Sequence, residues 1–576
     1  MQREHLLKQL TDDSEKIWDI VVIGGGATGL GIAVDAASRG YSTVLLEQSD
    51  FAKGTSSRST KLVHGGVRYL AQGDISLVFE ALHERGLLRQ NAPHLVKNQA
   101  FIIPSYDWWK GPFYNIGMKV YDMMAGKLGL GPSEKISRKK TMQAIPNLDE
   151  NHLNGGVIYH DGQFDDSRLA INLAQTAVEN GAVVINYMRV TGLIKDRENI
   201  ISGVKVVDEE NRYLKSISSI PNYSYLDKNS EKSNQSDTFT IRSRVVINAT
   251  GVFVDAVMQM DDNSSPRMIR PSQGIHIVLD KSFLQGDSAI MIPKTSDGRV
   301  LFAVPWHGKV VVGTTDTPLK LNETSLEPRA LEHEIEFVLT TAAQYLKKDP
   351  KREDVLSVFA GLRPLAAQES EQTSSNQSGS GKNSKKDIND KQGIDENREE
   401  PSTKEISRSH KLIISLSGLI TITGGKWTTY RKMAEDSVNK AWMVGGLAEK
   451  KCVTHNMPIH GYVKNIDFDS PAYFYGSDRA QIDDMVHQNP TLANRLHPDY
   501  EYIRAHVVWA ARHEMARTVE DFLSRRVRML LLDARVSMEM APEVAMIMAQ
   551  ELGRDETWIK SQVQDYIELA NGYILS

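Results

Sequence analysis

Residues 19–47, DIVVIGGGATGLGIAVDAASRGYSTVLLE, decide the fold of this chain. The run from Ile20 to Ile23 is apolar and β-branched, which favours a buried strand. A glycine-rich turn follows, and the apolar residues between Leu30 and Ala37 recur at helical spacing. Gly40 ends that helix, and residues 41–46 have the pattern of a second strand. The stretch therefore predicts a strand–helix–strand unit with parallel strands.

The turn carries Gly24, Gly26 and Gly29 in the pattern G-x-G-x-x-G. The first glycine allows the tight turn, the second lets a pyrophosphate approach the backbone, and the third lets helix and strand pack closely. The phosphates then lie at the positive N-terminus of the helix. Glu47 ends the second strand, where a carboxylate binds ribose hydroxyls. Together these features predict a Rossmann-like dinucleotide site.

Both NAD and FAD bind to such a unit, and three features favour FAD. The unit is N-terminal, and residues 49–60, SDFAKGTSSRST, form a polar segment able to wrap a second nucleotide half. Residues 245–251, VVINATG, end a late strand in an alanine–threonine–glycine turn that is common in flavoproteins. The sequence has no second G-x-G-x-x-G motif for a nicotinamide. We therefore expect the substrate itself to reduce the flavin.

The composition excludes several classes of protein. The 576 residues include 68 Lys and Arg against 73 Asp and Glu, a net charge of −5, which argues against a nucleic-acid binder. The single cysteine, Cys452, has no partner for a disulfide, zinc or iron–sulfur site, so we predict no metal. The first residues lack the apolar run of a signal peptide, and no run is apolar enough to span a bilayer. We expect a cytoplasmic protein, with peripheral attachment to a membrane left open.

The secondary-structure pattern continues after the dinucleotide unit. An amphipathic helix is expected over residues 167–181 and one strand over residues 182–190. The segments GIHIVLD, RVLFAVPW and KVVVGTTD are predicted strands up to about residue 316, and a helix is expected over 327–347. The strand with GIHIVLD is expected to alternate between buried and exposed positions.

We predict an α/β fold of two interleaved parts and a separate helical region. A Rossmann-like FAD-binding fold and a β-sheet-rich substrate domain share residues 17–440, and an all-helical domain follows at 445–576. Two polar inserts interrupt the first part, at residues 216–238 and 369–405. The second insert contains too few apolar residues to offset the entropy of ordering, so we predict a disordered loop there.

Six blocks rich in glycine, arginine and lysine carry a resemblance. They are KLVHGGVRYL (61–70), SQGIHIVL (272–279), VGTTD (312–316), AGLRPL (360–365), ISR (406–408) and GGKWTTYRKMAE (424–435). At these blocks the chain resembles the FAD-dependent glycerol-3-phosphate dehydrogenase family, within the D-amino-acid-oxidase-like flavoproteins. The resemblance runs from about residue 17 into the C-terminal helical region, and the two polar inserts are where the chain departs from the family's common length.

The resemblance implies a substrate site. Arg68 and Tyr69 match the family's substrate-contacting pair, and Arg363 matches the arginine beside the reacting hydroxyl. Arg408 and Lys426 match further basic residues of the active site. This fits the chemistry, because a buried phosphate monoester carries nearly two negative charges and needs cations.

The resemblance and the glycine motif together give the expected cofactor-binding set. A helix beginning near Thr428 would direct its N-terminus at the flavin and stabilise negative charge on the reduced ring. The full set is Gly24, Gly26, Gly29, Glu47, Thr55, Ser56, Gly66, Gly251, Gly425 and Thr428.

The implied reaction is oxidation of sn-glycerol 3-phosphate at C2 to dihydroxyacetone phosphate, with hydride passing to FAD. His276, which matches a histidine near the flavin, is the first candidate for the general base, since its intrinsic pKa suits proton transfer near neutral pH. In the alternative, Arg363 or Lys426 polarises the hydroxyl and water takes the proton. These three residues form the predicted catalytic set.

In the family, electrons usually pass on to a membrane quinone. Residues 106–129 mix aromatic, methionine and lysine side chains, a composition that favours the bilayer interface. The residues concerned are Trp108, Trp109, Phe113, Tyr114, Met118, Met123 and Met124, together with Lys110, Lys119 and Lys127. A core contact or a dimer contact is the alternative, and the family also implies a homodimer.

Three other functions remain open from the sequence. The nearest is a glycerol-3-phosphate oxidase that reduces oxygen to hydrogen peroxide. Amino-acid or sarcosine-type oxidases share the fold but need only one carboxylate clamp, and a non-enzymatic flavoprotein would not need the substrate cations.

A further group of charged residues lies in the helical region. His513, Glu514, Arg517, Asp521, Arg525 and Arg526 are expected to form a solvated face or an interdomain network.

Overall fold

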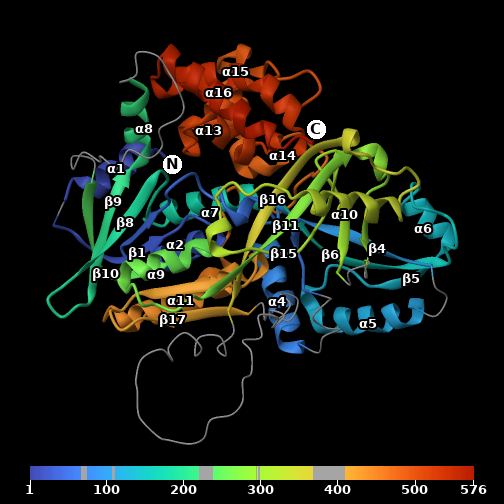
Figure 1. The fold of residues 1–576 in the computed structure, drawn as a ribbon, viewed down its shortest axis with the longest axis horizontal. Coiled ribbons are helices and arrows are strands. Elements are labelled where there is room, and N and C mark those ends of the chain that lie inside the picture. The colour runs from blue at the N-terminus through green and yellow to red at the C-terminus, as the bar shows by residue number, and fades with distance from the viewer. Residues whose placement is uncertain are drawn as a thin grey trace, which may run out of the picture.

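The computed structural model describes residues 1–13, 15–66, 74–106, 110–218, 238–292, 295, 299–367 and 409–575. Two β-sheets lie side by side, and a group of C-terminal helices covers them on the side away from α4 (Ile75–Asn91) and α5 (Lys110–Ala125) (Figure 1). This is the α/β fold with a helical C-terminal region that the sequence predicts.

The first sheet is built on the predicted dinucleotide unit. Strand β1 pairs in parallel with β2 on one side and with β10 on the other, and α2 connects β1 to β2. The strand order is β17-β18-β10-β1-β2-β7, with β9 beside β10 and β8 beside β9. The elements are β1 (Ile17–Ile23), α2 (Ala27–Ser38), β2 (Thr43–Leu46), β7 (Val183–Ile185), β8 (Met188–Lys195), β9 (Ile201–Asp208), β10 (Thr238–Asn248), β17 (His410–Ile414) and β18 (Ile420–Gly424).

The single strand expected over residues 182–190 is two strands, and that prediction was wrong. The chain turns between β7 and β8 at Tyr187, whose φ is +58°. The turn is held by distant partners, because the backbone N–H of Tyr187 donates to the Ser49 carbonyl at 2.9 Å. The Tyr187 hydroxyl donates to Asp521 Oδ1 at 2.7 Å. Since these partners are far away in the sequence, the local pattern contains no sign of the break.

The second sheet has the order β15-β11-β14-β13-β12-β4-β6-β3, with β16 beside β11 and β5 beside β6. Strand β11 is buried from Pro271 to Leu279 without alternation, contrary to expectation, because strands flank it on both edges and side chains cover both of its faces. The strands are β3 (Leu62–Val63), β4 (Val96–Ser105), β5 (Glu134–Ser137), β6 (Gly155–Phe164), β11 (Ile269–Asp280), β12 (Ala289–Ile292), β13 (Leu301–Trp306), β14 (Lys309–Gly313), β15 (Thr317–Pro318) and β16 (Val355–Ala366).

Helices cover the edges and faces of the two sheets. The helix expected over 327–347 is shorter, because α10 spans Glu332–Ala343. The other helices of this part are α1 (Arg3–Thr11), α6 (Arg138–Ala144), α7 (Asp166–Glu179), α8 (Glu209–Ser218), α9 (Val254–Asp261) and α11 (Tyr430–Val444). Helix α8 reaches into the first predicted insert, whose residues 219–237 lie outside the described residues, as does all of the second insert.

The C-terminal region packs onto the first sheet through one continuous apolar core. That core joins residues of α2, such as Leu30, to residues as distant as Trp558. The boundary at residue 445 stays a prediction. The helices after it are α12 (Arg479–Gln488), α13 (Arg504–His513), a π-helical turn (Asp521–Arg526), α14 (Met529–Leu532), α15 (Ala534–Leu552) and α16 (Glu556–Asn571).

The charged residues of this region form an interdomain network rather than a solvated face. Glu514 is fully buried and accepts two hydrogen bonds, at 2.9 and 2.7 Å, from the equally buried Arg168 of α7. Arg525 and Arg526 are also buried and pair with Asp50, close to the dinucleotide turn. The side chains of these residues therefore hold the helical region to the first sheet.

Candidate functional site

The glycine turn has no room for side chains. Gly24 has φ of +109°, and a Cβ there would lie 2.7 Å from the Ala249 carbonyl oxygen. A Cβ on Gly29 would lie only 1.9 Å from the carbonyl oxygen of Gly24. The turn can therefore bring the N-terminus of α2 directly against a ligand, which is the role predicted for these glycines.

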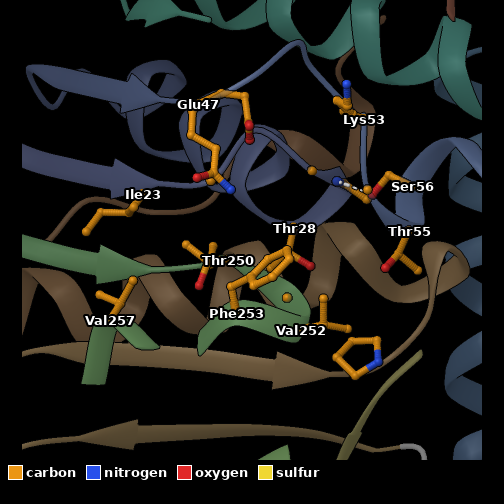
Figure 2. A pocket seen from close by; sticks show the side chains of 18 of the residues that line it. Ile23, Thr28, Glu47, Lys53, Thr55, Ser56, Thr250, Val252, Phe253 and Val257 are labelled. Carbon is orange, nitrogen blue, oxygen red and sulfur yellow. Dashed lines mark hydrogen bonds between the residues drawn. The ribbon is translucent and has the colours of Figure 1, made fainter. Parts of the chain in front are cut away.

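A cavity of about 570 Å³ opens over this turn. Glu47, Lys53 and Ser56 face it from the N-terminal unit, and Thr250, Val252 and Phe253 face it from the segment after β10 (Figure 2). Of the predicted cofactor-binding residues, Gly24, Gly26, Glu47, Thr55, Ser56, Gly251 and Gly425 line this cavity.

Polar groups are fixed around the cavity. Glu47 accepts backbone hydrogen bonds from Gly25 at 2.6 Å and Ser49 at 2.8 Å. Burial nonetheless raises the pKa of its carboxyl group. The Ser56 hydroxyl accepts the backbone N–H of Ala27 at 2.9 Å, and the Thr55 hydroxyl donates to the Leu362 carbonyl at 2.6 Å.

These features fit FAD. A dinucleotide needs backbone N–H groups and a positive helix terminus for its phosphates, and the turn and α2 offer both. It needs a carboxylate for the ribose, which Glu47 can provide from the end of β2. It also needs apolar walls for its rings, and Val252, Phe253 and Val257 line the cavity.

A second cavity, of about 170 Å³, lies across β16 from the first. Arg363 lines this smaller cavity while its neighbour Pro364 lines the larger one, so the two cavities lie on opposite sides of this strand. Gly66, one of the predicted cofactor-binding residues, lines the smaller cavity. The other polar residues of its wall are Thr60, His64, Asp161, Arg299, Thr314, Thr315 and Asp316.

Arg363 is held against β11 and the segment that follows β14. Its guanidinium donates to the carbonyl oxygens of Thr315 at 2.9 Å and Gln273 at 3.2 Å. It also contacts Asp316 at 3.3 Å. The side chain lies over Gly274, where a Cβ would be 2.3 Å from Nη2. Because Gly274 of the neighbouring strand β11 has no side chain, the Arg363 side chain can fill the space above it.

His276 is buried beside the smaller cavity and reaches it through Thr60. Its Nε2 lies 2.9 Å from Thr60 Oγ1, and its ring stacks on Phe359 with 4.9 Å between ring centroids. Burial, assisted by the charges of Lys61 and Arg363, lowers the pKa of His276 well below its usual value. The imidazole is therefore neutral near pH 7.

Lys426 lines the larger cavity, directly after two glycines with positive φ, Gly424 at +78° and Gly425 at +71°. The helix expected at Thr428 begins with a 3-10 turn over Trp427–Thr429, and α11 starts at Tyr430. Thr428 is buried, and its hydroxyl donates to the His64 carbonyl at 3.3 Å. The start of this helix is thereby tied to the segment that lines the smaller cavity.

Three predicted residues, Arg68, Tyr69 and Arg408, lie outside the part of the chain that the structure describes. Other residues of the smaller cavity were missed as site residues. Asp316 and Thr314 belong to the VGTTD block, whose composition was a usable signal, and Thr60 ends the polar segment after Glu47. Asp161 and Arg299 have no distinguishing sequence context.

Two family models match the chain. One, described as FAD dependent oxidoreductase, matches residues 19–377. The other, described as C-terminal domain of alpha-glycerophosphate oxidase, matches residues 420–558.

Individual proteins match nearly the whole chain. The mitochondrial glycerol-3-phosphate dehydrogenase of Schizosaccharomyces pombe is 35% identical over 625 residues, which cover 98% of this chain and 89% of that protein. The human mitochondrial glycerol-3-phosphate dehydrogenase is 35% identical over 99% of this chain and 75% of its own length. An X-ray structure of the glycerol-3-phosphate dehydrogenase from Bacillus halodurans complexed with FAD has a TM-score of 0.73 and 26% identity, covering 99% of this chain and 97% of that one. From these matches and the geometry of its cofactor cavity, the chain belongs to the FAD-dependent glycerol-3-phosphate dehydrogenase family.

Proposed function

We propose that the protein oxidises sn-glycerol 3-phosphate to dihydroxyacetone phosphate with FAD as the hydride acceptor. The observation that carries this proposal is the smaller cavity, which contains Arg363 and is separated from the FAD cavity by strand β16. A small anionic alcohol held by Arg363 there would lie next to the cofactor. The family membership of the chain supports the same substrate.

When bound, FAD supplies an acceptor for the hydride that leaves C2 of the substrate. The chain's own residues bind the substrate, exclude water and remove the hydroxyl proton. Arg363 stabilises the charge that develops on the C2 oxygen, because its guanidinium is already fixed by Gln273 and Thr315 and needs no reorganisation.

The phosphate requires more positive charge than Arg363 supplies. In the described wall of the smaller cavity, Arg299 and Arg363 are balanced by Asp161 and Asp316. A dianionic phosphate therefore needs additional cations nearby. We assign this role to Arg68, Arg408 and Lys426, which the family resemblance indicates and which remain proposals.

We propose that the hydroxyl proton passes through Thr60 to His276. Thr60 lines the smaller cavity, and its hydroxyl lies within hydrogen-bond distance of His276 Nε2. The substrate hydroxyl would give its proton to Thr60 Oγ1 while the Thr60 proton moves to Nε2, so one proton enters and one leaves the threonine. His276 then acts as the base, in contact with the substrate only through Thr60.

Replacement of Thr60 by valine should therefore lower the rate of flavin reduction by about 100-fold, the usual contribution of a proton-transfer group. Thr60→Ser keeps the hydroxyl and is the matched control, with a rate close to wild type.

Because the pKa of His276 is lowered, its neutral form persists below pH 6.5, so the rate of flavin reduction should stay flat between pH 8 and 6. Stopped-flow absorbance gives both results. A Thr60→Val rate within threefold of wild type would favour polarisation by Arg363 or Lys426, with water as the base.

The substrate is tested by anaerobic titration of the purified flavoprotein. We expect sn-glycerol 3-phosphate to bleach the flavin, and glycerol, glycine and proline to leave it oxidised, because they lack the phosphate. Bleaching by an amino acid and not by the phosphate ester would refute the proposal.

The electron acceptor is tested in the same cuvette. We propose a quinone, the acceptor that the family resemblance implies, so a soluble quinone analogue should restore the flavin band much faster than air does. Faster recovery with oxygen, with formation of hydrogen peroxide, would instead establish the oxidase reaction. The implied homodimer stays a prediction that analytical ultracentrifugation can test.

We propose that α4 and α5 form the surface that meets the membrane. None of the described helices is both long and apolar enough to cross a bilayer. Among the described side chains of these two helices, large apolar ones are nevertheless exposed, namely Ile75 (61%), Phe79 (59%), Val120 (37%) and Met123 (76%). Such a patch suits insertion into the headgroup region.

This surface differs in detail from the expected one. Met118 is buried and Met124 packs partly against the core, so these two methionines do not belong to it. Trp108 and Trp109 lie outside the described residues. We expect a Phe79→Ser, Met123→Ser double variant to bind vesicles at least about tenfold more weakly, since each exposed side chain loses transfer free energy. Met546→Ser, on the exposed face of α15, is the control in a cosedimentation assay. Equal binding by all three proteins would exclude this surface.

A further inference from the structure

One loop supplies much of the wall of the FAD cavity. We call residues 49–56 the cavity loop; its residues Ala52 to Ser56 all line the cavity. The loop leaves the end of β2 and contacts the glycine turn at only a few points. One of them is the hydrogen bond from the Ala52 N–H to the Gly25 carbonyl at 3.0 Å. Contacts on the other sides of the loop also help to fix its position.

One charged contact of the loop is made by Asp50, which does not line the cavity. This carboxylate is completely buried. It accepts two hydrogen bonds from Arg526, at 2.6 and 2.9 Å, and one from Arg525 Nε at 2.5 Å. The two guanidinium groups lower the pKa of Asp50 despite its burial. Burying the Asp50 carboxylate without these partners would cost a large free energy. Asp50 can therefore be buried only together with the two arginines.

The two arginines are consecutive residues that reach one carboxylate. In an α-helix, successive side chains diverge by about 100°. Here Asp521–Arg526 forms a π-helical turn, closed by a 3.0 Å hydrogen bond from the Val527 N–H to the Phe522 carbonyl. Such turns are rare and are frequently found at functional sites. The π-helical turn thus lies where the side chains of Arg525 and Arg526 converge on Asp50.

A second contact ties the loop at Lys53. Its Nζ lies 2.8 Å from Glu520 Oε2, and the other oxygen of Glu520 accepts a hydrogen bond from Arg525 at 2.8 Å. Arg525 also donates to Asp521 at 2.8 Å. Arg525 therefore connects both anchoring points of the cavity loop, Asp50 directly and Lys53 through Glu520.

We propose that Arg525 and Arg526 are positioning residues of the cofactor site. Through Asp50 they fix the cavity loop, so the affinity for FAD depends on side chains of the C-terminal helical region that do not line the cavity. The inference rests on the proposed binding of FAD and does not depend on which substrate is oxidised.

The C-terminal region contains a closely matched control. Arg528 is as fully buried as Arg526 and also pairs with a buried carboxylate, Asp165, at 2.8 Å. Its partner lies at the start of α7 and not in the cavity loop. Arg526→Met and Arg528→Met therefore remove equivalent buried charges at the same interface, and only the first should release the loop.

The test compares FAD dissociation constants of the two variants, measured by flavin fluorescence on protein depleted of cofactor and reloaded. We expect Arg526→Met to raise the dissociation constant by about 10- to 100-fold and Arg528→Met by less than threefold, while both lower the Tm. At saturating FAD, the kcat of Arg526→Met should return to within threefold of wild type, which a general loss of structure would not allow. Equal FAD affinities in the two variants would overturn the proposal.

Milder substitutions keep the test informative if Arg526→Met does not fold. Arg526→Lys keeps the charge but cannot make two parallel hydrogen bonds to Asp50. Glu520→Gln affects a side chain that is 21% exposed and weakens its ion pairs with Lys53 and Arg525, while Asp50 keeps both arginines. Each should weaken FAD binding by about three- to tenfold. Unchanged affinity in both would refute the role of the network, whereas failure of the wild type to bind FAD would refute the proposed function itself.

Discussion

Replacement of Arg363 by methionine is expected to lower kcat/KM for sn-glycerol 3-phosphate by about 1,000-fold while FAD stays bound. Methionine keeps most of the side-chain volume over Gly274. It removes the positive charge that β16 contributes to the wall of the smaller cavity. The substitution removes stabilisation of the transition state, in which negative charge develops on the C2 oxygen. It also leaves the polar groups that hold the guanidinium without a partner, which adds to the cost.

Steady-state kinetics with a soluble acceptor, together with the flavin spectrum, measure this effect. Arg138→Met is the control, because Arg138 is 54% exposed and pairs only with Glu150 on the surface. Arg363→Lys should fall between methionine and wild type, since lysine keeps the charge but not the planar geometry. An Arg363→Met enzyme within tenfold of wild type would remove Arg363 from the reaction.

Replacement of Gly29 by alanine is expected to abolish measurable FAD binding. The new Cβ, attached to the backbone of α2, would meet the backbone carbonyl oxygen of Gly24 in the turn at 1.9 Å. Neither can move without displacing the N-terminus of α2 from the cavity. We expect FAD affinity to fall by at least about 100-fold, since the phosphate-binding N–H groups move with the helix.

Gly192→Ala provides the matched control for this prediction. Gly192 lies in β8 of the same sheet, and a Cβ there would contact only Lys205 Cδ, at 3.9 Å. Equilibrium dialysis with FAD should give a wild-type affinity for this variant. Normal FAD binding by Gly29→Ala would contradict the placement of the phosphates at the glycine turn.

The dinucleotide unit could be predicted because its information is local. Apolar periodicity over residues 20–46 sets the strands and the helix, and the spacing of Gly24, Gly26 and Gly29 sets the turn. The parallel pairing of β1 with β2 follows from that pattern. The phosphate-binding turn and the ribose carboxylate of the larger cavity could therefore be predicted from residues 20–47 alone.

The substrate side was only partly predictable, because its wall is assembled by sheet topology. The assembled sheet, including β6, β11 and β16, brings Arg363 together with Thr60, Asp161 and Arg299. The surroundings of His276 could likewise not be predicted from the local sequence. Its residue type suggested a general base, but only tertiary packing shows that Thr60 lies between His276 and the cavity.

The anchoring of the cavity loop could be predicted only in part, because an interdomain network was one of two expectations for Arg525 and Arg526 while their partner Asp50 was not foreseen. Asp50 and Arg526 are 476 residues apart, and charged residues in a helical segment normally face solvent. Nothing local distinguishes a buried arginine from an exposed one. Only the packing of the C-terminal helices onto the first sheet shows that these charges pair across the interface.

The most direct test of the central claim is anaerobic stopped-flow reduction of the flavin by sn-glycerol 3-phosphate that carries deuterium at C2. The account predicts single-turnover bleaching by the unlabelled substrate and a rate several-fold slower with the deuterated one, because the C2–H bond breaks as hydride leaves for FAD. It also predicts that the sn-1 enantiomer bleaches the flavin far more slowly, since its C2 hydrogen would face away from the cofactor. Bleaching at the same rate with both isotopes, or no bleaching by either, would contradict hydride transfer from C2 of this substrate.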